Sequence, residues 1–149
     1  MRSKLFLMAF ALVALVIAGC SKEKESESNG LATKILGDWH YASEEYDVDV
    51  YVTFNADGAF EEYQRLGEGC YRLYTGTWTM KGSELNGMYS DGESWGSGYK
   101  VSFAGDTMTL TATNKSAEAL TYIKESVPEE VKQTAIEPFD LRSVDMRWF

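Results

Sequence analysis

The chain has 149 residues, enough for one domain with a sizeable core. Its 23 acidic and 14 basic residues give a net charge of −9, which excludes nucleic acid and anionic lipid headgroups as main partners, because a negative surface repels phosphates. The two cysteines are Cys20 and Cys70.

The first nineteen residues have the pattern of a secretory signal. Arg2 and Lys4 precede an unbroken apolar run over residues 5–18. This run has 14 residues, whereas a membrane-spanning helix needs about 20. The run ends in Ile17-Ala18-Gly19-Cys20, which resembles the lipobox of bacterial lipoproteins.

The lipobox resemblance implies a covalent membrane anchor. In that family the cysteine sulfur receives a diacylglycerol, the peptide is cut before the cysteine, and the new amino terminus is acylated. Residues 1–19 would then be a lipoprotein signal peptide, and Cys20 would be lipidated. Two or three acyl chains hold a protein firmly, since each buried methylene contributes about 0.8 kcal/mol.

Residues 20–30 are predicted to be the acylated cysteine and a flexible tether. Residues 21–30 contain no apolar side chain and cannot bury surface. Ser21 is not the aspartate that retains lipoproteins in an inner membrane, and the Lys/Glu-rich run resembles the surface-export signals of some Gram-negative lineages. We therefore expect a lipid-anchored protein of the outer membrane, on its periplasmic or surface-exposed face. The alternative is a solvated spacer that carries no sorting signal.

Residues 31–125 have a hydrophobic pattern with period 2. Apolar residues alternate with polar ones over 48–54 and again over 107–113, which indicates strands with one buried face. Turn sequences such as Asn55-Ala56-Asp57-Gly58 separate these segments. We predict eight strands, over 39–44, 46–54, 59–65, 71–80, 84–90, 95–103, 107–113 and 118–124.

Short hairpins between these strands predict an all-β fold. An eight-stranded up-and-down antiparallel barrel avoids exposed edges by closing, and a β-sandwich is the alternative. Residues 126–149 would form a C-terminal helix and tail. Ser126-Val127-Pro128-Glu129 resembles a capping box, which predicts a short helix from about residue 128 to residue 136. Val144, Met146 and Trp148 alternate and could add an edge strand.

Gly37-Asp38-Trp39, before the first predicted strand, resembles the G-x-W signature of lipocalins. In that family Gly37 and Trp39 would be structural, with the Trp packed across the closed end of the barrel under a basic residue; Lys124 stands in the last predicted strand here. Gly76-Thr77-Trp78 and Met108-Thr109-Leu110 further resemble lipocalin-like domains of bacterial lipoproteins. The resemblance covers residues 31–125 and implies a ligand-binding barrel.

Catalytic and metal chemistry is poorly supported by the sequence. His40 is the only histidine, and nothing marks a nucleophile as its partner, so we expect no catalytic residue and no enzyme. Asp47 and Asp49 would share one strand face, where Ca²⁺ is conceivable, but a solvated hairpin is favoured and no metal or cofactor is expected. Cys70 is expected to be an inert loop residue, with a reactive thiol as the alternative.

Aromatic residues are the strongest indication of function. Trp78, Trp95 and Tyr99 are our candidate ligand-binding residues, because each combines an apolar ring with a polar group. The alternative is a barrel filled by its own side chains. We expect a membrane-anchored lipocalin-like lipoprotein that binds a small hydrophobic or amphipathic ligand. A non-enzymatic protein-interaction module, as an inhibitor or accessory subunit of a cell-envelope complex, is the alternative.

Overall fold

The computed structural model describes residues 29–114, 116–138 and 147–149. The signal segment, Cys20 and most of the predicted tether lie outside the described residues. So do Val144 and Met146 of the possible edge strand.

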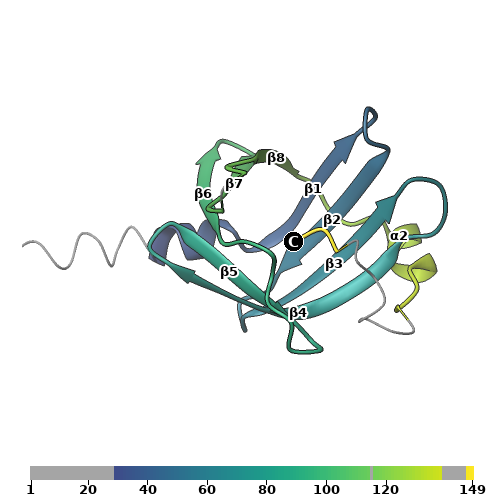
Figure 1. The fold of residues 1–149 in the computed structure, drawn as a ribbon, viewed down its shortest axis with the longest axis horizontal. Helices are drawn as coiled ribbons and strands as arrows, with labels where there is room; N and C mark the ends of the chain where they lie inside the picture. The colour runs from purple at the N-terminus through teal and green to yellow at the C-terminus, as the bar shows by residue number, and fades with distance from the viewer. Residues whose placement is uncertain (1–28, 115, 139–146) are drawn as a thin grey trace, which may run out of the picture.

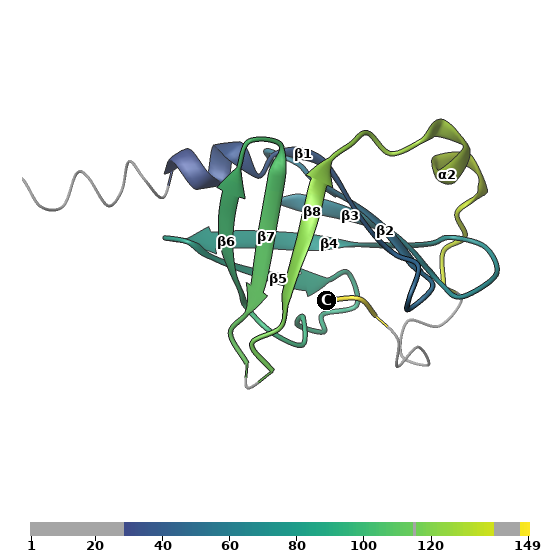
Figure 2. The same ribbon diagram turned by 90° about the horizontal axis from the view of Figure 1, so that it is seen from above.

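Eight antiparallel strands form one closed barrel in which each strand pairs with the next and the last pairs with the first (Figures 1 and 2). The strands are β1 (Gly37–Ser43), β2 (Val48–Phe54), β3 (Ala59–Leu66), β4 (Arg72–Lys81), β5 (Glu84–Tyr89), β6 (Tyr99–Ala104), β7 (Thr107–Ala112) and β8 (Ala119–Lys124). The predicted all-β, up-and-down barrel is confirmed, and the sandwich is excluded.

The sixth strand begins later than predicted, at Tyr99 instead of residue 95. Trp95 pairs back onto the preceding strand, because its N–H donates to the carbonyl of Gly87 at 3.0 Å. Its indole ring fills the space beside Gly87, where an added Cβ would lie 2.1 Å from the ring. Residues 95–98, which were predicted to be part of the sixth strand, therefore belong to a loop that folds over β5.

The barrel is loosely paired at two seams, β1–β8 and β5–β6. Each seam has two paired positions, and these are Trp39↔Lys124, His40↔Ile123, Glu84↔Lys100 and Leu85↔Tyr99. Neither seam has further pairs toward the end that carries the connections 44–47, 67–71, 90–98 and 113–118, which we call the open end. The other end carries the connections 55–58, 82–83 and 105–106, and we call it the closed end.

The closed end has the geometry that the G-x-W resemblance implies. A short helix over residues 29–34 precedes β1, and the Trp39 indole N–H donates to the carbonyl of Ile35 at 2.7 Å. Gly37 has φ +101°, a conformation that favours glycine. The Nζ of Lys124 lies 4.4 Å from the Trp39 ring centroid and donates to the carbonyl of Leu36 at 2.5 Å. Lys124 thus takes the place of the basic residue that the resemblance implies.

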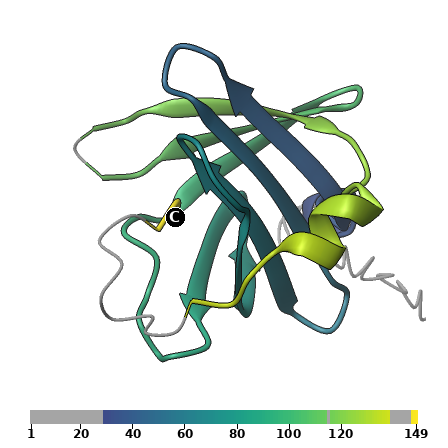
Figure 3. The same ribbon diagram turned by 90° about the vertical axis from the view of Figure 1, so that its right-hand side faces the viewer.

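The predicted C-terminal helix is present as α2 (Glu129–Thr134), and it packs outside the barrel (Figure 3). Val127 and Val131 lie against Tyr51 and Tyr63 of β2 and β3. The predicted capping box is wrong, because Pro128 is the N-cap and no side chain caps the helix. Val127, directly before this N-cap, is buried in the same cluster. No helix in the described part of the chain is both long and apolar enough to cross a membrane.

Candidate functional site

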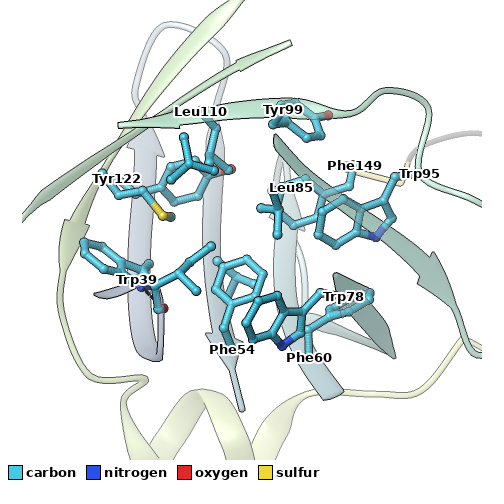
Figure 4. Close-up of a cluster of buried hydrophobic side chains, with 14 of the residues drawn as sticks. Trp39, Phe54, Phe60, Trp78, Leu85, Trp95, Tyr99, Leu110, Tyr122 and Phe149 are labelled. Carbon is cyan, nitrogen blue, oxygen red and sulfur yellow. Dashed lines mark hydrogen bonds between the residues drawn. The ribbon is translucent and has the colours of Figure 1, made fainter. Parts of the chain in front are cut away.

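The segment Arg147–Phe149 lies inside the open end of the barrel. Phe149 is 7% exposed, and its ring stacks on Trp95 with centroids 4.3 Å apart and an interplanar angle of 19°. Tyr99 meets the same ring edge-on at 5.6 Å. Figure 4 shows Phe149 between the side chains of Trp95 and Leu85. This segment belongs to no strand, yet its last ring is part of the core.

Trp148 bridges the seam at which β1 and β8 separate. Its ring lies 5.2 Å from Tyr41 of β1, and its indole N–H donates to the hydroxyl of Tyr122 of β8 at 2.7 Å. Its backbone N–H donates to Oε1 of Gln64 at 2.9 Å. The indole therefore fills a position that strand pairing leaves uncovered.

Polar contacts at the rim hold the same segment. The Tyr89 hydroxyl lies 3.2 Å from both the N and the O of Phe149, so it can accept from one and donate to the other. The Arg147 guanidinium lies 4.5 Å from the Tyr89 ring centroid and is paired with Asp91. This pairing holds the pKa of Asp91 below its ordinary value.

Glu62 forms the polar floor beneath this segment. It lies between Phe60 and Gln64 on the inward face of β3 and is fully buried. Neither of its carboxylate oxygens has a hydrogen bond of normal geometry among the described residues. Burial raises the pKa of Glu62 to about 8, although the nearby Trp148 amide, Tyr89 hydroxyl and Arg147 charge act in the opposite direction.

Tyrosine hydroxyls surround this acid. Burial is the main cause that raises the pKa of Tyr99 to about 12, and burial also raises the pKa values of Tyr89 and Tyr122; the Glu62 charge adds to each shift. All three are therefore neutral at physiological pH. The open end thus combines flat aromatic walls with neutral hydroxyls and one buried acid, an arrangement suited to an amphipathic molecule.

Comparison with known proteins decides the family. The profile of the lipocalin-like domain matches residues 21–110, which is more than half of the chain. The chain belongs to the lipocalin-like domain family. A search of the curated proteins found no match, and a search of the solved structures found none either.

The lipocalin-like barrel brings two of the three candidate ligand-binding residues together. Trp95 and Tyr99 lie with ring centroids 6.1 Å apart in the open end. Trp78 lies apart from them, packed edge-on against Phe54 at 5.6 Å (Figure 4). The Trp78 indole N–H points to the carbonyls that flank the β2–β3 turn, at 3.1 Å. Trp95 and Tyr99, both predicted from the sequence, thus form one aromatic wall of the site.

Glu62, Gln64 and Phe149 are residues of the site that were not predicted from the sequence. For the first two a signal was available, since both share the inward register of β3 with Phe60. For Phe149 no local pattern existed, because its partners lie 50 or more residues earlier in the chain.

His40 belongs to strand β1, but its side chain lies in a polar cluster that is separate from the open end. Its Nε2 is 2.7 Å from Oδ1 of Asp49, and its Nδ1 is 2.7 Å from Oε2 of Glu125. The donor and acceptor roles in the two contacts depend on which ring nitrogens carry protons. The ring also stacks on Tyr51, with centroids 4.1 Å apart. The described contacts of both ring nitrogens are thus to acids.

The arrangement of Asp47 and Asp49 in the β1–β2 hairpin differs from the predicted one. Asp47 lies in the turn with φ 49°, so it does not share a strand face with Asp49. Asp49 instead accepts a hydrogen bond from the Tyr71 hydroxyl at 2.9 Å. Among the described residues, no group of three or more His, Cys, Asp or Glu side chains could hold a metal ion. Cys70 is exposed in the β3–β4 connection.

Proposed function

We propose that this lipocalin-like protein binds a small hydrophobic or amphipathic molecule in the open end of its barrel, in the place that Trp148 and Phe149 occupy. The stacking of Phe149 on Trp95 at 4.3 Å is the observation that carries the proposal. A flat apolar ligand would make the same contact with Trp95 and Tyr99. The ligand and the segment would therefore compete for one position.

The strength of this competition sets the affinity that a ligand would show. Burying a large apolar side chain stabilises by roughly 1.5–3 kcal/mol. Displacing Trp148 and Phe149 would thus weaken an external ligand by about tenfold for every 1.4 kcal/mol that their burial contributes. An occupied open end lowers the apparent affinity without abolishing binding.

Removing the two rings should raise the affinity for an apolar probe. We expect the double variant Trp148→Ala/Phe149→Ala to bind the neutral fluorophore N-phenyl-1-naphthylamine at least tenfold more tightly than the wild type, because the position is then vacant. Adding Trp95→Ala to the double variant should abolish this gain. Fluorescence titration measures both effects.

The matched control is Tyr46→Ala, which removes an aromatic ring that is 70% exposed in the 44–47 turn. This variant should bind N-phenyl-1-naphthylamine with the same affinity as the wild type. Equal affinities for the wild type and the double variant, both insensitive to Trp95→Ala, would contradict a ligand site in the open end.

We also propose that acyl chains on Cys20 anchor the protein in the outer membrane, and that it acts by binding and not as an enzyme. The lipobox sequence supports the anchor, and the two acids that contact His40 support a non-catalytic role for that residue. We expect Cys20→Ser to release the protein or to block its maturation, as measured by cell fractionation. A fully processed mutant that stays in the membrane would contradict the anchor.

A protein-interaction module, acting on a partner in the cell envelope, is the second candidate. The observation that favours it is the packing of Phe149 and Trp148 within the open end. If the double variant binds no apolar probe, this candidate replaces the first.

A further inference from the structure

We propose that the ligand of the open end carries an ammonium group, and that Glu62 is the residue that selects it. The proposal deepens the binding function proposed above and rests on it. It assigns a head group to the ligand, whereas the barrel alone indicates an apolar body.

The first step is the position of Glu62. Residues on the inward face of β3 alternate, so Phe60, Glu62 and Gln64 all point into the barrel. Glu62 is 0% exposed and both of its oxygens are without a hydrogen bond of normal geometry among the described residues. A buried carboxylate left without a partner is strongly destabilising, and a bound cation that donates hydrogen bonds removes that cost.

The second step is the chemistry of the segment that occupies the site. The Trp148 backbone N–H and the Arg147 positive charge both act on Glu62 and lower its pKa. Next to them, the Phe149 ring stacks on Trp95. The segment therefore places a positive charge close enough to the acid to lower its pKa, and a flat ring against the aromatic wall. A ligand in its place needs the same two parts.

The third step is the charge that surrounds Glu62. The titratable and charged groups that face it come from four strands and from the terminal segment, and they are Tyr74, Tyr89, Tyr99, Tyr122 and Arg147. The tyrosines are neutral below pH 9, and Arg147 is paired with Asp91 at the rim. An ammonium group can form an ion pair with Glu62 once it displaces the proton of that acid, whereas a ligand carboxylate gains no such pair.

Three indole probes that differ in the head group test the proposal. They are tryptamine, which carries an ammonium; tryptophol, which is neutral; and indole-3-propionate, which is anionic. Isothermal titration calorimetry of the Trp148→Ala/Phe149→Ala protein should show tryptamine bound at least tenfold more tightly than tryptophol. The propionate should bind most weakly. Glu62→Gln should abolish the preference for tryptamine.

Glu61→Gln is the matched control. Glu61 is the neighbour of Glu62 in the same strand and faces outward, so this change removes an equal charge without altering the floor of the site. The preference for tryptamine should survive it. The charge of the whole protein cannot then explain the result.

A second readout needs no change at Glu62. The free site holds a proton on this acid at pH 7, since burial raises its pKa to about 8, and an ammonium group would expel that proton. Tryptamine binding should therefore release close to one proton at pH 7, as seen by comparing buffers of different ionisation enthalpy. Its affinity should rise about tenfold between pH 7 and pH 9.

The possible outcomes distinguish the selection of an ammonium group by Glu62 from the binding of a ligand in the open end, on which it rests. If tryptophol binds as tightly as tryptamine and no proton is released, the selection by Glu62 is overturned while binding in the open end stands. If none of the three probes binds the double variant, both proposals fail. A preference that persists in Glu62→Gln overturns the role of Glu62.

Discussion

Replacing Glu62 with glutamine is expected to remove most of the pH dependence of folding stability between about pH 5 and pH 9. The carboxyl ionises near 4.5 in an unfolded chain, and burial raises its pKa to about 8 in the fold. Between these two values the folded state holds a proton that the unfolded state has lost, so stability falls as pH rises from about 4.5 to about 8 and levels off above it. The full loss is about 5 kcal/mol at most, at 1.36 kcal/mol for each unit of pKa difference.

Urea unfolding at a series of pH values measures this effect. We expect the wild type and Glu62→Gln to differ little at pH 5, and the variant to be the more stable protein by several kcal/mol at pH 9. Glu61→Gln should follow the wild type. Parallel profiles for the wild type and Glu62→Gln would show that folding does not raise the pKa of Glu62.

The second large effect is expected from Gly87→Ala. The Trp95 ring is packed between Gly87 and the Phe149 ring, and an added Cβ would lie 2.1 Å from one ring carbon and 2.4 Å from the next. The ring must move, which disturbs the stacking of Phe149 as well. We expect a loss of about 3 kcal/mol of unfolding free energy, in the range of severe overpacking.

Gly96→Ala is the control for this change. Gly96 is the residue after Trp95, and an added Cβ there meets no atom within 4 Å. Its stability should stay within about 0.5 kcal/mol of the wild type. If Gly87→Ala and Gly96→Ala unfold at the same urea concentration, the position assigned to Trp95 is wrong.

The barrel could be predicted from the sequence because its strands are short, locally paired and connected by hairpins. Period-2 alternation marks the buried face of β2 and β7 directly. The sixth strand was misplaced at its start because Trp95 has high β-propensity, although its ring is needed beside Gly87 in a loop. Such tertiary packing overrides a local pattern.

The site was harder to predict than the barrel. Strand β3 inverts the usual pattern, since Glu62 and Gln64 face inward while Tyr63 faces outward and is covered by α2. From the sequence alone, the polar Glu62 and Gln64 would be assigned to the outer face of β3 and the apolar Tyr63 to the inner face. Only the packing of α2 on Tyr63 explains the reverse arrangement. The place of Phe149 depends on contacts with Trp95 and Tyr99 far away in the chain, which no local pattern encodes.

The most direct test of the central claim, a ligand site in the open end, is fluorine NMR of protein labelled with 5-fluorotryptophan. The four tryptophans report on two places, since Trp95 and Trp148 line the open end, whereas Trp39 and Trp78 lie away from it. Single Trp→Phe variants assign the four signals. On addition of an apolar probe, we predict shifts for Trp95 and Trp148 and unchanged signals for Trp39 and Trp78. Shifts confined to Trp39 and Trp78, or no shift at all, would contradict the claim.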